Sequence, residues 1–242
     1  MKWVNPFVGP RDRMVSDQVL RRGVTDRRVL DAMHAVPREA FVPESLRDAA
    51  YSDKPLPIGE GQTISQPYIV GAMAEALRLG GDENVLEIGT GSGYAAAVLA
   101  HLARAIHSVE RLPNLARRAR DTLRRLGYDS VEVIEGDGSR GWVPAAPYDA
   151  IVVTAGAPRL PPSLCAQLRP GGRLVMPVAD KDHGQVLVRV VRGDGDEDLV
   201  ESLEPVRFVP LIGAEGWADE RDFHNQTSSL PPTARSGEPG RG

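Results

Sequence analysis

Between residues 84 and 178 the chain alternates short apolar runs with helix-compatible stretches, and this alternation restricts the possible fold more than any other feature. Apolar strands that are separated by helices are typical of a parallel sheet covered on both faces. The sequence therefore predicts an α/β fold with a doubly wound, Rossmann-like sheet. The strand-like runs are residues 84–88, 105–110, 131–138, 148–156 and 173–178, and the helix-compatible stretches are residues 94–102, 113–126 and 161–168.

The sequence on either side of this region has a different character. Two apolar runs after residue 180 flank a Gly/Asp-rich turn, which predicts antiparallel strands at the edge of the sheet. Apolar residues at helical spacing between residues 14 and 33 predict two short helices, the second capped by Thr25 or Asp26. Residues 52–61 are dense in proline and glycine and predict a loop.

These patterns divide the chain into three parts. Residues 1–60 form an N-terminal helical extension and loop, and residues 61–216 form the α/β domain. Residues 217–242 are polar and lack periodicity, so we expect a disordered tail.

Composition narrows the range of partners and locations. The chain has 29 basic and 33 acidic residues, a net charge of −4, which indicates no nucleic-acid or membrane partner. A single cysteine, Cys165, excludes an intramolecular disulfide and favours a cytoplasmic protein. The start lacks a secretory signal pattern, and no apolar run reaches the roughly 18 residues of a membrane span. The five histidines show no metal-ligand spacing, so we expect no metal site.

The glycine-rich turn EIGTGSG follows the first strand, where a doubly wound sheet binds ligands. A dinucleotide and S-adenosyl-L-methionine would both suit such a turn, and Glu110 after the second strand would bind ribose hydroxyls in either case. Glu87 would repel a pyrophosphate but attract the ammonium group of S-adenosyl-L-methionine. Tyr94 is bulky where the dinucleotide pattern has a small residue. The turn therefore favours S-adenosyl-L-methionine.

Two further short stretches allow both a structural and a functional interpretation. Asp137, in the GDG sequence after the third strand, is placed to accept a hydrogen bond from an adenine amine, although a tight turn is the simpler interpretation. The stretch PIGEGQTISQPY precedes a helix that we expect to begin near Pro67. Ser65 or Gln66 could simply be the N-cap of that helix.

Taken together, these features resemble the class I methyltransferases, and more specifically the protein-L-isoaspartate O-methyltransferase family. The resemblance spans about residues 11–217, and its TISQP block is far more family-specific than the glycine turn. The chain departs from the family pattern at Gly71, where alanine is more usual, and in a longer tail after Trp217. The matching segments are AVPREAFVP (35–43), LPIGEGQTISQPYIV (56–70), VLEIGTGSGY (85–94), SVER (108–111), GDGSRGW (136–142), YDAIVVTAGAP (148–158), LRPGGRLVMPV (168–178) and VRFVPL (206–211).

This resemblance implies methyl transfer from S-adenosyl-L-methionine to the α-carboxyl group of L-isoaspartyl residues in damaged proteins and peptides, which initiates repair through a succinimide. It implies Ser65 as the catalytic residue, and substrate binding by Ile58, Thr63, Ser65 and Thr154. It implies cofactor binding by Glu87, Gly89, Thr90, Gly91, Ser92, Gly93, Glu110, Asp137 and Gly138. We expect a cytoplasmic monomer whose partners are isoaspartyl-containing proteins and peptides.

Four alternatives remain at this point. A relative could methylate one dedicated peptide during natural-product maturation, with the tail selecting that peptide. The arginine-rich residues 117–125 could indicate a nucleic-acid methyltransferase, but TAGAP stands where a base-binding NPPY-like motif would follow the fourth strand. A nicotinamide dehydrogenase is opposed by Glu87 and Tyr94, and a non-catalytic cofactor-binding scaffold by the intact TIS block.

Overall fold

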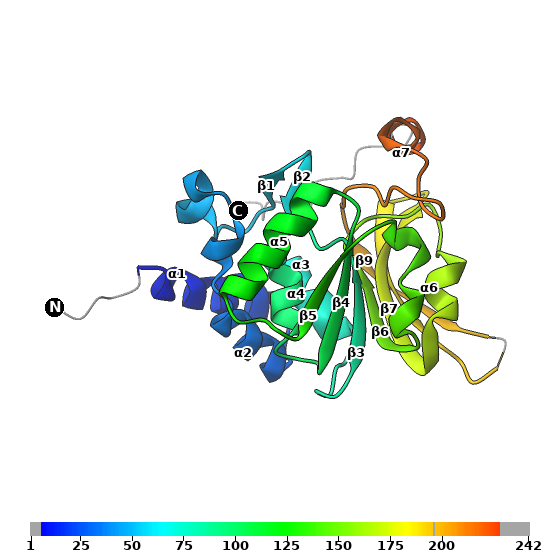
Figure 1. The fold of residues 1–242 in the computed structure, drawn as a ribbon, viewed down its shortest axis with the longest axis horizontal. Helices are drawn as coiled ribbons and strands as arrows, with labels where there is room; N and C mark the ends of the chain where they lie inside the picture. The colour runs from blue at the N-terminus through cyan, green and yellow to red at the C-terminus, as the bar shows by residue number, and fades with distance from the viewer. Residues whose placement is uncertain (1–5, 196, 228–242) are drawn as a thin grey trace, which may run out of the picture.

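The computed structural model describes residues 6–195 and 197–227, and its centre is one seven-stranded sheet in the order β5-β4-β3-β6-β7-β8-β9 (Figure 1). Strands β5, β4, β3, β6 and β7 run parallel to one another, and β8 and β9 are antiparallel to their neighbours, as the sequence predicts. After β3 the chain forms β4 and β5 on one side of that strand, and it then crosses over to form β6 on the other side. Open α/β sheets bind ligands where the strand order reverses in this way, so we expect a ligand at the carboxyl end of β3. The strands are β3 Asn84–Ile88, β4 Ala105–Glu110, β5 Val131–Glu135, β6 Tyr148–Val153, β7 Leu168–Asp180, β8 Gly184–Val191 and β9 Leu199–Pro205.

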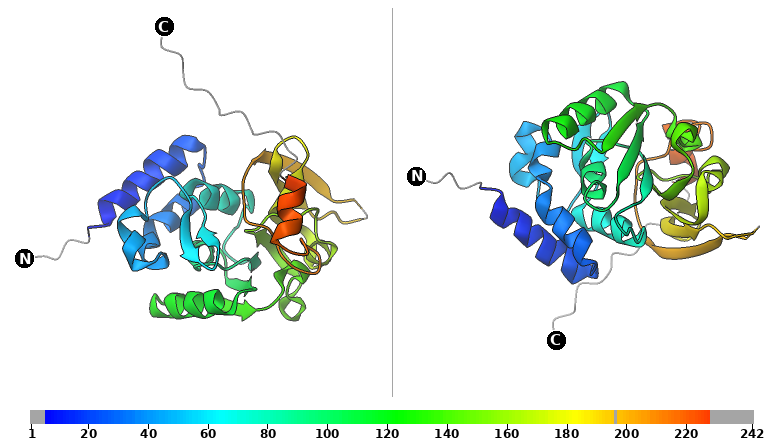
Figure 2. Two further views of the ribbon diagram at one scale, coloured as in Figure 1. Left: turned by 90° about the horizontal axis from the view of Figure 1, so that it is seen from above. Right: turned by 60° about the horizontal axis from the view of Figure 1, so that its bottom comes forward.

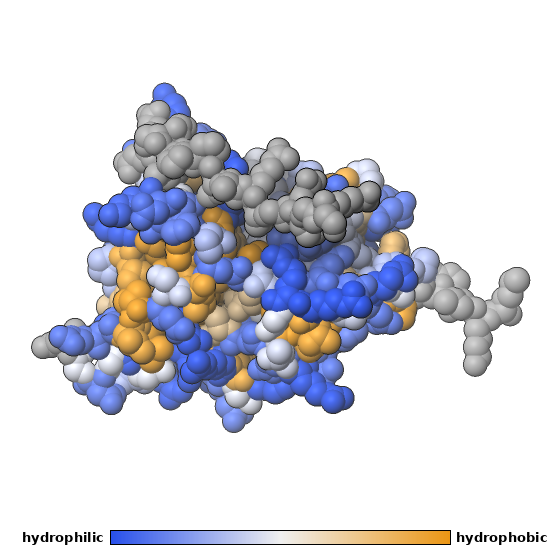
Figure 3. Space-filling model, turned by 180° about the vertical axis from the view of Figure 1, so that it is seen from behind, coloured by the Kyte–Doolittle hydropathy of each residue, from blue (hydrophilic) through white to orange (hydrophobic). Residues whose placement is uncertain are grey.

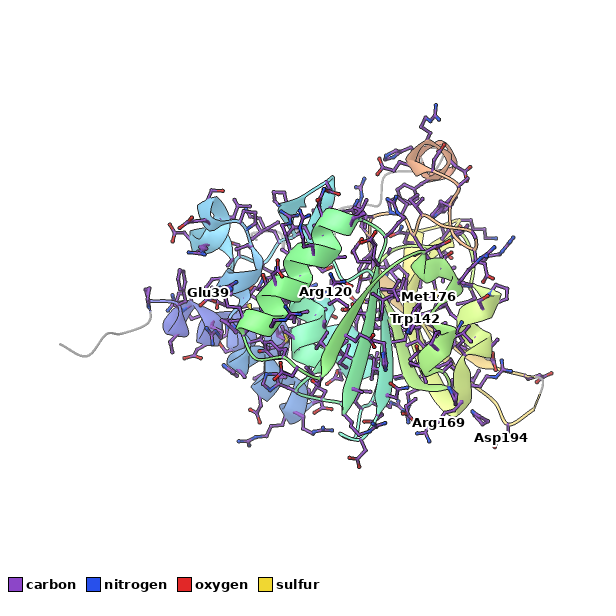
Figure 4. All side chains as sticks on the ribbon, in the orientation of Figure 1. Glu39, Arg120, Trp142, Arg169, Met176 and Asp194 are labelled. Carbon is purple, nitrogen blue, oxygen red and sulfur yellow. The ribbon has the colours of Figure 1, made fainter. Side chains whose placement is uncertain are left out.

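Successive residues of the central strands enter two separate hydrophobic cores, because side chains alternate across a sheet. Val85 packs into the first core and Leu86 into the second. Met176 belongs to the second core, and Trp142 packs against it (Figure 4). The first core receives α3 Pro67–Ala76, α4 Tyr94–Leu99 and α5 Pro113–Arg125, and the second receives α6 Pro162–Ala166.

The N-terminal extension packs on α3, α4 and α5, the helices that cover one face of the sheet, and its apolar side chains join the first core (Figure 2). Its first helical segment ends at Gly23, whose φ is 106°, and the Asp26 side chain caps the second by accepting from the Arg28 N–H at 2.8 Å. The elements are α1 Val8–Arg13, the π-helical η1 Met14–Val19, the short η2 Leu20–Arg22 and α2 Arg27–Ala35, followed by η3 Arg38–Phe41 and η4 Glu44–Ala49.

Gly71 is explained by this close packing of the extension on α3. A Cβ atom at this position would lie 2.9 Å from Cγ1 of Val19 and 3.1 Å from Sδ of Met33. An alanine would therefore push the extension away from α3, and the glycine allows contact at the cost of helix propensity.

A two-stranded hairpin, β1 Leu56–Gly59 and β2 Gln62–Ile64, stands where the sequence predicted a loop, so that prediction is wrong for residues 56–59. Leu56 and Ile58 are buried and alternate with exposed neighbours, a strand pattern that the surrounding glycines and prolines conceal. The chain reverses through Gly59, Glu60 and Gly61, whose φ values of 93°, 53° and 72° all lie in the left-handed region.

The predicted disorder of the tail is wrong for residues 217–227. Trp217 is only 2% exposed, and α7 Glu220–Thr227 follows it. A single large aromatic ring can anchor an otherwise polar segment because it buries a large apolar area. The rest of the predicted tail, residues 228–242, lies outside the described residues.

Within residues 6–195 and 197–227, no helix has the length and apolar character to cross a membrane. On the face opposite to Figure 1, hydrophobic areas are separated by hydrophilic side chains (Figure 3). The edge strand β9 exposes Leu199 and Val200.

Candidate active site

The glycine-rich turn joins β3 to α4 and is fixed against the end of β6. Gly89, Gly91 and Gly93 adopt φ values of 95°, 54° and 89°, which explains glycine at all three positions. The Thr154 hydroxyl donates to the Gly89 carbonyl at 2.7 Å, and a Cβ atom on Gly89 would lie only 2.4 Å from Oγ1 of Thr154. The turn therefore presents bare backbone at the carboxyl end of β3.

Two adjoining pockets form one groove over this turn, and both are lined by Thr63, Gly89, Gly91 and Thr154. The first pocket is lined in addition by Ser65, Val70, Met73, Thr90, Ser92 and Tyr94. The second is lined in addition by Gln62, Glu110, Arg111, Gly138, Ile212 and Glu220. The first pocket is thus lined mainly by apolar side chains and hydroxyl groups. The second pocket also has the carboxylates of Glu110 and Glu220 in its wall.

The β1–β2 hairpin forms one wall of this groove and is held by helix α5. Nη2 of Arg118 donates to the Ile58 carbonyl at 2.7 Å. Nδ2 of Asn114 donates to Oε1 of Glu60, in the hairpin turn, at 2.8 Å. These contacts join the β1–β2 hairpin to a helix more than fifty residues later in the chain.

Ser65 follows β2 and lies in the wall of the first pocket. The N-cap residue of α3 is Gln66, which makes no side-chain capping bond. The Ser65 hydroxyl makes no hydrogen bond to any residue of the described ranges 6–195 and 197–227. The simple capping interpretation of Ser65 is therefore not supported, and its hydroxyl is available to a ligand.

A buried arginine, Arg38, holds the backbone at Ser65. Its Nη2 donates to the Ser65 carbonyl at 2.7 Å, and its Nε donates to the Ala50 carbonyl at 2.7 Å. The guanidinium lies 4.8 Å from the ring centroid of Tyr94, and burial lowers its pKa, an effect that nearby Tyr94 partly opposes. Sequence reasoning assigned Arg38 no role, because a lone arginine gives no sign that it is buried.

Glu87 is fully buried beneath the glycine turn and does not line either pocket. The Ser108 hydroxyl donates to Oε2 of Glu87 at 2.5 Å, and Ser108 also pairs with Oγ1 of Thr90 at 2.6 Å. Oε1 of Glu87 is buried without a partner. Burial raises the pKa of Glu87 to about 8; the Ser108 hydrogen bond opposes this rise and the charge of Glu110 adds to it.

We expect Glu87→Gln to change how stability depends on pH. The folded-state pKa near 8 exceeds the ordinary value of 4.5, so the native protein holds a proton that the unfolded chain releases. Glu87 therefore lowers stability progressively as pH rises from about 4.5 to 8, and the neutral glutamine cannot. The difference in melting temperature, variant minus wild type, should grow across this window and level off above it. A difference that does not vary with pH would contradict the raised pKa.

The structure brings Glu110 and Gly138 into the groove but not Asp137. Glu110 accepts from the Gly91 N–H at 2.8 Å and the Leu112 N–H at 3.0 Å. The exposed Asp137 caps η5 Gly138–Arg140 and lines neither pocket. Although burial acts to raise the pKa of Asp137, hydrogen bonds from the Ala214 N–H and from Ser139 lower it.

Two other predicted residues lie behind the groove. Gly93 is buried, and a Cβ atom there would lie 3.1 Å from Cδ1 of Leu123, so it serves the packing of α4 on α5. Ile58 is 3% exposed and supports Gly91 from below, with Cδ1 at 3.4 Å from where a Cβ atom on Gly91 would lie.

Comparison with known proteins identifies the family. Residues 11–216 match the family described as Protein-L-isoaspartate(D-aspartate) O-methyltransferase (PCMT). The chain belongs to the protein-L-isoaspartate O-methyltransferase family. It is 61% identical over 212 residues to Protein-L-isoaspartate O-methyltransferase 1 of Rhodopseudomonas palustris (strain HaA2), covering 88% of this chain and 86% of that protein. It is 55% identical over 217 residues to Protein-L-isoaspartate O-methyltransferase 1 of Geotalea uraniireducens (strain Rf4), covering 90% and 99% of the two chains.

Solved structures of the same family share the fold. One protein-L-isoaspartate O-methyltransferase superposes with a TM-score of 0.76 at 30% identity, over 85% of this chain and 67% of that one. A putative protein-L-isoaspartate O-methyltransferase from Plasmodium falciparum, in complex with S-adenosyl-L-homocysteine, has a TM-score of 0.69 at 25% identity, over 82% and 96% of the two chains. The predicted class I methyltransferase fold is therefore confirmed.

Proposed function

We propose that the protein transfers a methyl group from S-adenosyl-L-methionine to the α-carboxyl group of L-isoaspartyl residues in damaged proteins and peptides, the step that initiates repair through a succinimide. Membership of the family supports this activity. The structural observation that carries it is the Ser65 hydroxyl, which lines the same groove as the glycine turn and has no partner in the described chain.

The chemistry of the residues that line the groove fits S-adenosyl-L-methionine. Gly89 and Gly91 leave backbone bare where a side chain would fill the space next to Thr154 and Ile58. Glu110 offers a carboxylate to ribose hydroxyls. Beneath the turn, Oε1 of Glu87 is buried without a partner in the described part of the chain, and an ammonium group that reached it would supply the missing hydrogen bond. When bound, this cofactor supplies an electrophilic sulfonium methyl group, and the residues that would hold it are those of the turn together with Glu110 and Gly138.

The remaining task of the protein is to place a carboxylate oxygen, because the acceptor is already ionised at neutral pH and needs no strong base. We assign the hydrogen bond to the acceptor carboxylate to Ser65. The first N–H groups of α3, which have no partner within a helix, add a partial positive charge beside it. Arg38 fixes the Ser65 backbone through its hydrogen bond to the Ser65 carbonyl. This restraint limits the positions that the Ser65 hydroxyl can adopt before the substrate binds. Thr63 and Thr154 lie at the junction of the two pockets and are assigned to the substrate.

The proposed activity is tested with two peptides that differ only in isoaspartate or aspartate at one position. The purified full chain is incubated with S-adenosyl-L-methionine that carries a labelled methyl group, and base-labile methyl ester is counted. Strong preference for the isoaspartyl peptide is the expected result. Equal transfer to both peptides, or binding of S-adenosyl-L-homocysteine without transfer to either, would overturn the proposal.

A dedicated peptide substrate is not favoured, since both relatives compared above carry the name of the general enzyme. The other predictions about partners and location stay predictions: a monomeric, cytoplasmic protein without nucleic-acid or membrane partners. The net charge of −4 supports the absence of an anionic partner.

A further inference from the structure

The chain continues past the end of the family match, and this continuation is docked on the domain. The match ends at residue 216, and Trp217 follows it. Nε1 of Trp217 donates to the Gly156 carbonyl, in the loop after β6, at 2.8 Å. The ring of Phe223, in α7, meets the Trp217 ring edge-on with centroids 5.5 Å apart. Helix α7 is therefore attached through a buried aromatic anchor.

This attachment places α7 over the carboxyl ends of the strands, at the edge of the sheet that also carries the β1–β2 hairpin (Figures 1 and 2). Glu220, the first residue of α7, lines the second pocket together with Glu110 and Gly138. A segment outside the family match thus forms part of the groove that holds the cofactor's nucleoside under the proposed function.

Glu220 differs from Glu110 and Asp137, two other acidic residues at this end of the sheet, in the hydrogen bonds that its carboxylate makes. Both oxygens of Glu110 accept backbone N–H groups, and both oxygens of Asp137 accept from Ser139 or Ala214. Glu220 makes no hydrogen bond or ion pair within the described part of the chain. An ionised carboxylate can only accept hydrogen bonds, and the nucleoside offers donors in its ribose hydroxyls and its exocyclic amine.

We propose that Glu220 accepts a hydrogen bond from the nucleoside of the cofactor and that α7 is a part of the cofactor site that lies outside the family match. The inference rests on the proposed function only in taking S-adenosyl-L-methionine as the ligand. It predicts a contribution to binding of the product S-adenosyl-L-homocysteine, which has the same nucleoside, so catalysis is not needed to detect it.

The test is calorimetric titration of the full chain with S-adenosyl-L-homocysteine. We expect Glu220→Ala to raise the dissociation constant about fivefold to twentyfold, the range for a hydrogen bond to a charged group that is partly exposed to solvent. Glu135→Ala is the matched control, because Glu135 is an exposed carboxylate at the end of β5 that lines neither pocket. An unchanged dissociation constant in Glu220→Ala, or an equal rise in both variants, would overturn the proposal.

Two truncated chains separate α7 from the residues beyond it. A chain that ends at Thr227 retains α7, and a chain that ends at Ala218 loses α7 but retains Trp217. The first should bind S-adenosyl-L-homocysteine like the full chain, and the second should bind at least as weakly as Glu220→Ala. Melting temperatures verify that both are folded. Unchanged affinity in the folded shorter chain would overturn the proposal.

Nucleoside analogues identify the donor. The homocysteine conjugate of inosine lacks the exocyclic amine, and 2′-deoxy and 3′-deoxy forms each lack one hydroxyl. The analogue that lacks the contacted group should bind wild type and Glu220→Ala equally, while the others keep the difference. A difference that persists with all three analogues would overturn the proposal. Failure of wild type to bind S-adenosyl-L-homocysteine at all would instead refute the proposed function.

Discussion

Gly89→Ala is expected to raise the dissociation constant for S-adenosyl-L-homocysteine by more than about 100-fold and to lower the melting temperature. Two effects combine at this position. The φ value of 95° is strained for any residue with a Cβ atom, a cost of about 1–3 kcal/mol. The new Cβ atom would also lie 2.4 Å from Oγ1 of Thr154, so the turn or the end of β6 must move. Calorimetric titration and thermal unfolding measure the two consequences.

Gly127→Ala is the control that separates strain from displacement. Gly127 has a φ value of 80°, and nothing lies within 4 Å of where its Cβ atom would be. This variant should lose stability to strain alone and bind the ligand normally. Adding Thr154→Ala to Gly89→Ala removes the atom that the new Cβ meets and should restore part of the affinity. Normal binding by Gly89→Ala would show that the turn does not contact the cofactor.

Ser65→Ala is expected to lower kcat/KM for an isoaspartyl peptide by about 10- to 100-fold, the value of one hydrogen bond to a charged acceptor. The dissociation constant for S-adenosyl-L-homocysteine should stay within about twofold of wild type, because the hydroxyl faces the substrate in the proposed arrangement. The melting temperature should change little, since this hydroxyl has no hydrogen bond within residues 6–195 and 197–227. Steady-state kinetics, titration and thermal unfolding check the three expectations.

Ser65→Thr is the matched variant, since it keeps a hydroxyl at the same position. It should retain more activity than Ser65→Ala at equal saturation with the methyl donor. Full activity of Ser65→Ala would show that the Ser65 hydroxyl has no role in methyl transfer. An equal loss in both variants would indicate that the pocket wall, and not the hydroxyl, sets the rate.

Local patterns predicted the sheet well. The bounds of β3 and β4 agree with the strand-like runs 84–88 and 105–110, because strands covered on both faces show as short, mainly apolar stretches between turns and helices. The Asp26 cap and the hairpin of β8 and β9 could also be predicted from the sequence, because both depend on residues that are close together in the chain. The glycine turn could be placed at the ligand-binding edge because it directly follows a parallel strand.

The sequence motifs named the residues of the candidate site but not how they are used. Ser65, Thr63 and Thr154 lie in the groove, while Glu87 is buried beneath it and Asp137 is turned to a loop. The choice between a groove-lining and a buried carboxylate depends on partners such as Ser108 and Ala214, which come from other parts of the chain.

By itself, the sequence determined the order of strands and helices, the turn that suits S-adenosyl-L-methionine and, through resemblance, the family. Only the tertiary structure decided which side chains meet. Arg38 reaches Ser65 across 27 positions, Arg118 reaches Ile58 across 60, and Trp217 reaches Gly156 across 61. The physical reason is range: strand and turn preferences arise between neighbours in the chain, whereas burial and hydrogen-bond partners arise between segments that only folding brings together.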